Sequence, residues 1–174
     1  MPPIVQIGAR RKQQAPSRPG PEAYLPVSLD DARRRGWEQL DVVLINGDAY
    51  VDHPTFGVPL IGRLLASRGF KVGIVSQPRW DDASGLVDFA ACGRPRLFFG
   101  VSSGNMDAMV NHYTAGKKRR SSDAYTPDAA PGRRPDYAAA VYARKLRKPA
   151  TTLATIAHHA HRSPWASGPM VSHA

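Results

Sequence analysis

The chain has 174 residues, of which 42% are hydrophobic; this suffices for one domain with a core, and the lack of any long apolar run excludes a membrane-spanning helix. A single cysteine, Cys92, excludes an internal disulfide and a cysteine-only metal site, and no secretory signal starts the chain, so we predict a cytoplasmic protein. The net charge of +10 is concentrated in residues 117–174, which hold 11 Lys/Arg against three Asp/Glu. A basic tail is more often a solvated loop or a docking surface than a reader of nucleic-acid sequence, so we do not expect nucleic-acid binding.

The first part of the chain predicts a leader, a short helix and a strand. Residues 1–23 are rich in Pro, Gln and Arg without apolar periodicity, which predicts a disordered leader. Residues 29–35 form a predicted helix that Ser28 can cap and Gly36 can end. Residues 41–46 are apolar without alternation, as is typical of a parallel strand covered on both faces.

The middle of the chain predicts repeated strand-helix units. A helix over residues 55–68, capped by Thr55, precedes a strand over residues 71–76. A third strand over residues 96–101 is followed by a helix over residues 106–113. The strand starts lie 30 and then 25 residues apart, which is the spacing of βαβ units. We therefore predict an α/β fold with a Rossmann-like parallel sheet and flanking helices.

The last part of the chain changes in character. Residues 114–135 are predicted to form a long basic loop, and residues 136–148 a helix. No convincing strand follows, so we expect the sheet to be incomplete and residues 149–174 to be an irregular, disordered tail. The predicted organisation is thus a leader (1–23), one domain (24–148) and a tail (149–174).

Four polar side chains follow the first strand and form the main candidate site: Asp48, Tyr50, Asp52 and His53. Ligands of open α/β sheets bind at the carboxyl ends of strands, where carboxylates and imidazoles can act as acids, bases or ligands. The alternative is local structure, in which Asp52 caps the next helix and His53 bonds to the backbone. No catalytic role is assigned to any residue.

The second and third strands supply further candidate ligand-binding residues at the same edge: Gln77, Ser102, Asn105 and Asp107. The turn at 102–105 precedes a helix, so its backbone amides could bind an anion. Ordinary turn and cap chemistry is the favoured alternative there. The histidines at 158, 159 and 161 lack supporting carboxylates, and we expect no metal site.

Residues 24–147 carry a series of motifs in a fixed order. They include Leu25-Pro-Val-Ser28, Gly47-Asp-Ala-Tyr-Val-Asp-His-Pro54, Ile61-Gly-Arg63, Gln77-Pro78, Gly93-Arg-Pro95, Phe98-Phe-Gly100, Gly104-Asn-Met-Asp107, Asp123-Ala-Tyr-Thr-Pro127 and Arg134-Pro-Asp136. In this series the chain resembles the N-terminal domain of the YgiQ-type radical SAM family. It departs from the family after residue 147, and we interpret the remainder as the product of a frameshift or truncation.

The resemblance implies a function that lies outside this chain. Members of the family carry a radical SAM barrel, in which a Cys-x3-Cys-x2-Cys loop holds a 4Fe-4S cluster that binds S-adenosylmethionine. This chain has one cysteine and is expected to hold no cofactor itself. The resemblance therefore implies an accessory domain whose partner is that barrel, without radical chemistry of its own, and with an unidentified small-molecule or macromolecular substrate.

Two other functions stay open from the residues. The first is a small-ligand or nucleotide-phosphate binding module, although no G-x-G-x-x-G or Walker A sequence occurs. Some related Rossmann-like domains bind cobalamin through Asp-x-His-x-x-Gly, but Asp52 and His53 are adjacent here, which argues against it. The second is a basic nucleic-acid-binding protein, which rests on the tail alone.

Overall fold

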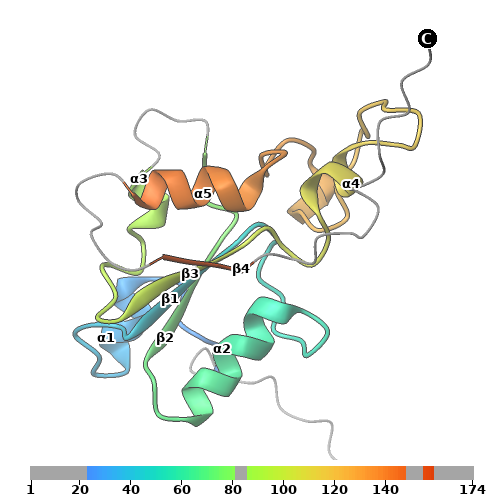
Figure 1. Ribbon diagram of the computed structural model, residues 1–174. Helices are drawn as coiled ribbons and strands as arrows, with labels where there is room; N and C mark the ends of the chain where they lie inside the picture. Colours follow the sequence, from blue (N-terminus) through green and yellow to red (C-terminus); the bar gives the residue numbers. More distant parts are fainter. Residues whose placement is uncertain (1–22, 81–85, 148–154, 159–174) are drawn as a thin grey trace, which may run out of the picture.

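The computed structural model describes residues 23–80, 86–147 and 155–158. Its centre is a four-stranded, wholly parallel sheet in the order β2-β1-β3-β4 (Figure 1). The strands are β1 (Val42–Asn46), β2 (Val72–Ser76), β3 (Phe98–Ser102) and β4 (Thr155–His158). The register aligns the ends of β1, β2 and β3, because Asn46 lies opposite both Ser76 and Ser102. The prediction of an α/β fold with a parallel sheet is confirmed.

Helices cover both faces of the sheet. They are α1 (Leu29–Arg34), α2 (Gly57–Ser67), α3 (Leu86–Phe89), α4 (Ala108–His112), the 3-10 turn η2 (Pro127–Ala129) and α5 (Ala138–Leu146). Figure 1 shows α2 on one face and α5 with α3 on the other, whereas α4 lies beyond the carboxyl edge of the strands. None of the helices in the described ranges is long and apolar enough to cross a membrane.

The alternation of side chains along β1 divides the core into two parts. Val43 and Ile45 belong to a cluster with Phe99, Tyr142 and other side chains on the α5 side of the sheet. Val42 and Leu44 belong to a second cluster, with Val58, Val72 and Ile74, on the α2 side. Because successive side chains of a strand point to opposite faces, an unbroken apolar run serves both layers.

The predicted helix caps were right in one case and wrong in another. Ser28 caps α1 by accepting a hydrogen bond from the Asp31 amide at 3.1 Å. Thr55 does not cap α2, which begins at Gly57 with Phe56 at its cap position and no side-chain cap. The Thr55 hydroxyl lies instead 2.8 Å from His53 Nδ1 in a local turn, which removes it from the helix end.

The expectation that no strand follows α5 was wrong. Residues 155–158 pair with β3 as the parallel strand β4 and extend the sheet at that edge. A four-residue strand with one large aliphatic residue has no strong sequence pattern, but main-chain pairing to an open edge does not require one. The short helix α3 was also not predicted. Residues 1–22 of the predicted leader and residues 149–154 and 159–174 of the predicted tail lie outside the described residues.

The core assignment predicts that Ile45→Ala lowers the free energy of unfolding by ~2–5 kcal/mol, because Ile45 is fully buried and its removal leaves a cavity. Leu64→Ala on α2 is the matched control, since Leu64 is 56% exposed and should cost well under ~1 kcal/mol. Urea denaturation followed by circular dichroism measures both changes. Equal losses in the two variants would contradict the assignment.

Candidate functional site

The carboxyl edge of the sheet is built by two close approaches of the backbone. The Gly47 amide donates to the Ser102 carbonyl at 3.2 Å, and a Cβ at Gly47 would lie 2.1 Å from the Ser103 oxygen. Gly104 has φ +114°, a conformation that favours glycine, and a Cβ there would lie 2.2 Å from Asp48 Oδ1. Both glycines therefore allow the segment after β3 to pack against the segment after β1.

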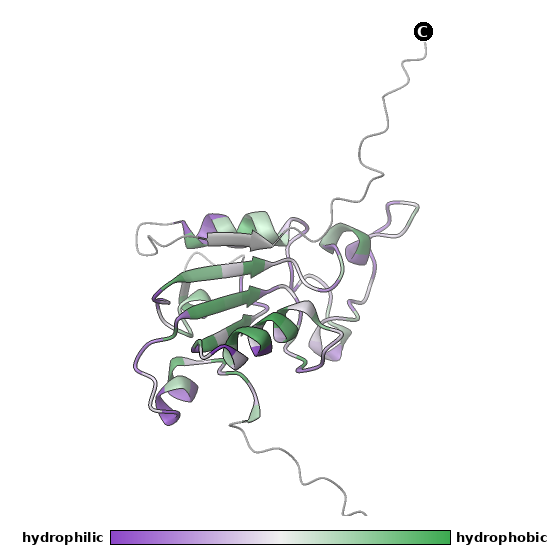
Figure 2. Ribbon diagram, turned by 60° about the horizontal axis from the view of Figure 1, so that its bottom comes forward, coloured by the Kyte–Doolittle hydropathy of each residue, from purple (hydrophilic) through white to green (hydrophobic). Residues whose placement is uncertain are grey.

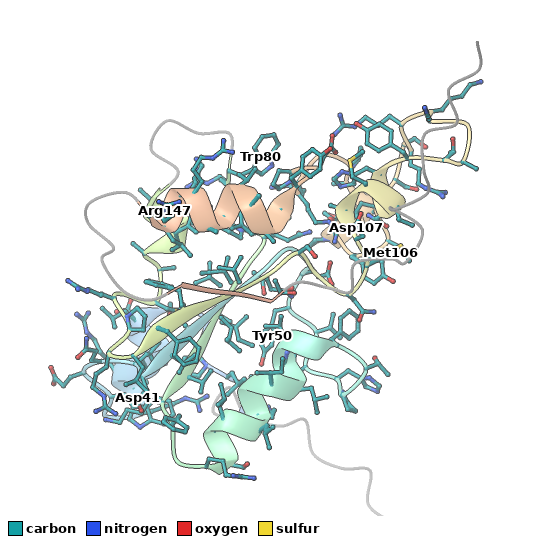
Figure 3. All side chains as sticks on the ribbon, viewed as in Figure 1. Asp41, Tyr50, Trp80, Met106, Asp107 and Arg147 are labelled. Atoms are coloured by element: carbon teal, nitrogen blue, oxygen red, sulfur yellow. The ribbon has the colours of Figure 1, made fainter. Side chains whose placement is uncertain are left out.

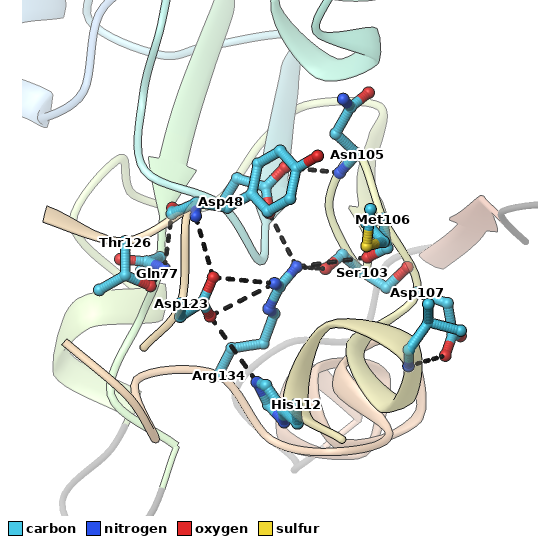
Figure 4. Close-up of polar contacts among 12 residues, drawn as sticks. Asp48, Gln77, Ser103, Asn105, Met106, Asp107, His112, Asp123, Thr126 and Arg134 are labelled. Carbon is cyan, nitrogen blue, oxygen red and sulfur yellow. Dashed lines mark hydrogen bonds and ion pairs between the residues drawn. The ribbon is translucent and has the colours of Figure 1, made fainter. Parts of the chain in front are cut away.

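At this edge Asp48 and Arg134 form a fully buried ion pair (Figure 4). The side chain of Arg134 is 0% exposed and that of Asp48 is 2% exposed. Arg134 donates from one terminal nitrogen to Asp48 Oδ1 at 2.8 Å and to the Ser103 carbonyl at 3.1 Å. The second Asp48 oxygen accepts from the Asn105 amide at 2.5 Å. The two residues are 86 positions apart, so the pair joins segments that are distant in the sequence.

The other terminal nitrogen of Arg134 faces Asp123, at 3.3 and 3.4 Å from its two carboxylate oxygens. Asp123 also accepts from the Tyr125 amide at 2.9 Å, and His112 Nε2 lies 3.7 Å away. His112 Nδ1 is 2.7 Å from Asp136, which in turn accepts from the Tyr113 hydroxyl at 2.9 Å. One guanidinium thus starts a polar network that reaches the C-terminal end of α4.

The two carboxylates that share Arg134 differ in their proton affinity. Burial raises the pKa of Asp48 above its ordinary value, and the hydrogen bond from Asn105 and the charge of Arg134 only partly oppose this. Burial also acts to raise the pKa of Asp123, but the Tyr125 amide, other hydrogen bonds and Arg134 together leave it below its ordinary value. Asp123 is therefore the more strongly stabilised anion of the two.

The side chains of Gln77 and Ser102 both form hydrogen bonds within the protein. Gln77 has a positive φ of 46° at the end of β2, and its side-chain amide donates to Thr126 Oγ1 at 2.7 Å. Ser102 Oγ accepts from the Gly104 amide at 3.1 Å. The edge thus brings together Asp48, Gln77, Ser102 and the backbone of Asn105, and each of them makes contacts within the protein.

The remaining candidate residues lie elsewhere. Tyr50 and Asp52 border a half-open hollow of about 330 Å³, and the Tyr50 hydroxyl accepts from the Leu25 amide at 3.0 Å (Figure 3 labels Tyr50). Asp52 forms an ion pair with Arg63 rather than capping a helix. His53 is exposed beside Thr55, and Asp107 caps α4 through the amide of Met109 at 2.9 Å.

Sequence reasoning missed the central residues of the network: Arg134, Asp123 and His112. Arg134 and Asp123 stand in motifs of the family resemblance, Arg134-Pro-Asp136 and Asp123-Ala-Tyr-Thr-Pro127. Their position in these motifs was the available signal in the sequence. We overlooked it because the loop was interpreted from its basic composition alone. Among the described residues, no group of three or more His, Cys, Asp or Glu could hold a metal ion.

Residues 24–158 match the family described as Radical SAM N-terminal. The chain belongs to this family. It is 52% identical over 138 residues to a UPF0313 protein of Rhodopseudomonas palustris and 54% identical over 125 residues to one of Bacteroides thetaiotaomicron. It is 50% identical over 129 residues to the UPF0313 protein YgiQ of Salmonella typhimurium. The resemblance found in the sequence is thereby confirmed. The departure from the family was placed too early at residue 147, because the family match extends to residue 158 and includes β4.

These alignments cover 79%, 72% and 74% of this chain, but only 20%, 20% and 17% of the three relatives. The chain thus spans about a fifth of the length of the curated relatives that it matches. No solved structure matches the chain. The radical SAM N-terminal region is therefore a part of a much longer protein in these relatives.

The buried ion pair predicts that Arg134→Met lowers the free energy of unfolding by ~3–5 kcal/mol, because two buried carboxylates lose their cation. The neighbouring Arg133→Met is the matched control, since Arg133 is exposed and its loss should change stability little. Chemical denaturation of both variants and the parent chain gives the comparison. Similar stability of the two variants would show that the pair does not hold the edge together.

The opposite pKa directions predict opposite pH dependence. Because the pKa of Asp123 is lowered, its stabilisation is present above its unfolded value of 3.8 and is lost as pH falls through the folded pKa. Because the pKa of Asp48 is raised, its ionisation lowers stability as pH rises from 3.8 through the folded pKa. As pH falls, the free energy of unfolding of the parent chain should therefore decrease relative to that of Asp123→Asn. Over the same change it should increase relative to that of Asp48→Asn. Denaturation from pH 7 to 3 measures both differences, and shifts of the same sign would disprove the assignment.

Proposed function

We propose that this chain is an accessory domain that packs against the radical SAM portion of its longer relatives and supports it. The 4Fe-4S cluster and S-adenosylmethionine would be held by that other portion, and the chemistry would take place there. The domain would contribute a rigid surface and cover part of the substrate site. A cytoplasmic location belongs to the same proposal.

The buried Arg134 carries this proposal. In an open α/β sheet the carboxyl edge is where ligands bind, but here Arg134 and the groups around it fill that position with protein contacts. The fixed edge is better suited to present the outer segments as a surface than to admit a ligand. Membership in a family named for the N-terminal part of radical SAM proteins agrees with that role.

The only cysteine of the chain does not suit a cluster ligand. Cys92 is buried in the core beside Ile74, and burial raises the pKa of its thiol to about 12. Iron–sulfur clusters are held by several thiolates, which a single buried thiol cannot provide. Cys92 therefore does not fit a 4Fe-4S cluster, and we assign the cluster ligands to the rest of the longer proteins.

A chimera tests the proposed function. Residues 24–158 of this chain would replace the matching region of the Rhodopseudomonas palustris relative, with a deletion of that region as the control. We expect the deletion to retain iron and sulfide, because the cluster ligands lie elsewhere, but to lose most of its reductive cleavage of S-adenosylmethionine or its solubility. The chimera should restore these properties, and a chimera that behaves like the deletion would contradict the proposal.

A second candidate function is supported by the hollow beside Tyr50. Its volume of about 330 Å³ is within the range of small-ligand pockets, and Tyr24, Arg35 and Asp52 also line it. The aromatic rings and charged groups together could hold a small polar aromatic molecule. The Ser102–Asn105 turn is less suited to such a module as an anion site, because its Gly104 and Asn105 amides already donate to Ser102 Oγ and to Asp48.

Thermal shift assays with nucleotides and S-adenosylmethionine test this second function. A ligand that binds the hollow should raise the melting temperature of the chain, and Tyr50→Ala should abolish the increase while Tyr137→Ala does not. Tyr137 is a suitable control because it is 70% exposed and does not line the hollow. No shift with any of these compounds at millimolar concentration would argue against binding of these ligand classes.

A further inference from the structure

An apolar surface is exposed on and beside α4, and we call it the α4 surface. It consists of Met106, Met109 and Val110, which are 38%, 37% and 61% exposed. Figure 2 shows α4 coloured largely as hydrophobic, and Figure 3 shows Met106 and Asp107 at its start. Because α4 lies beyond the strand ends rather than over a face of the sheet, these side chains do not complete either core cluster.

The protein holds the α4 surface in place at both ends. At the start of α4, Asp107 accepts from the Met109 amide at 2.9 Å, and Arg134 donates to the Met106 carbonyl at 3.3 Å. At the end of α4, His112 is buried against Asp136 at 2.7 Å. An apolar surface that is fixed before binding loses less conformational entropy when a partner covers it. The buried network thus prepares this surface for a contact.

The path of the chain indicates what covers the surface. Strand β4 is parallel to β3 and pairs His158 with Ser102, so it ends at the same edge from which the segment leading to α4 departs. The relatives are about five times longer than the matched region, and in a relative with the same sheet the polypeptide that follows β4 would start from this edge. A domain that follows β4 directly in the chain would therefore begin near α4 and not near the outer face of α2.

The charge around α4 indicates the chemistry of the partner. The loop that follows α4 carries four exposed cations, Lys117, Lys118, Arg119 and Arg120. Arg119 has an acidic neighbour, since it lies 3.9 Å from Asp136, but Lys117 and Lys118 extend the positive charge into solvent. A partner that fits has an apolar centre and an acidic rim.

We propose that the α4 surface is the docking face for the domain that follows this region in the longer relatives, with acidic residues of that domain against the 117–120 loop. The inference rests on the proposed function, because it assumes that the domain packs against the remainder of the protein. It goes further in assigning the contact to α4 rather than α2. Exposed Leu60 and Leu64 on α2, at 51% and 56%, form the competing apolar surface.

Binding in trans tests the assignment. The full 174-residue chain would be titrated by isothermal calorimetry into the Rhodopseudomonas palustris relative from which the matching region has been removed. We expect binding that weakens at least about tenfold in Met109→Asp/Val110→Asp, as for central residues of an interface. Leu60→Asp/Leu64→Asp is the matched control, with the same number of charges on the α2 surface, and should bind within about twofold of the parent chain.

A second pair of variants tests the charge. Lys117→Glu/Lys118→Glu should weaken binding and reduce its dependence on salt, because it removes the attraction to the acidic rim. Circular dichroism and the urea midpoint of each variant separate a lost contact from a lost fold. The positions chosen are exposed, so the folded state should survive in each case.

The outcomes separate the inference from the proposed function. If the parent chain does not bind at all, both are overturned. If it binds and the α2 variant is the one that weakens, the docking face alone is wrong and the proposed function stands. If the α4 variant instead abolishes a dimer of this chain in sedimentation and leaves binding to the relative unchanged, the surface belongs to a second copy and the inference is overturned.

Discussion

A single buried guanidinium holds the functional edge of this domain together. Arg134 is completely buried between Asp48, from the segment after β1, and Asp123, from the loop after α4. Removing a charge from water is costly, and the cost is offset only when oppositely charged and hydrogen-bonding partners surround it. The segments after β1 and β3 and the 114–135 loop must therefore all be in place before this interaction can form, and each then depends on the others.

This dependence explains how a long loop can be part of a compact domain. Residues 114–135 contain a short 3-10 turn and one partner of an isolated β-bridge, Arg119, which pairs with Tyr113. A loop of this length does not usually keep one conformation by itself. Here Asp123 and Arg134 bind it to the sheet edge, and Thr126 accepts a hydrogen bond from Gln77. The same network reaches α4 through the contact between Asp136 and His112. It therefore holds the α4 surface in a fixed position relative to the sheet.

The network also gives Asp48, in the segment after β1, a structural role in place of the ligand-binding role that its position suggests. A carboxylate at the end of a parallel strand suggests ligand binding, and Asp48 does lie at that position. Its oxygens are nevertheless occupied by Arg134 and the Asn105 amide, so its charge serves the contact between segments. Polar residues at a strand end can thus belong to the framework of a domain as well as to its chemistry, and the tertiary contacts distinguish the two.

Local sequence determined the strands β1, β2 and β3, the helix α2 and the parallel α/β class, because apolar runs and helical spacing depend on near neighbours alone. The ordered motifs also determined the family. Only the tertiary structure decided β4, which is specified by the open edge of β3, and the pairing of Asp48 with Arg134 across 86 positions. No local pattern encodes such a contact, since its stability comes from burial that exists only once the chain has folded. The loop that looked merely basic in sequence therefore supplied the cation on which the Asp48 edge depends.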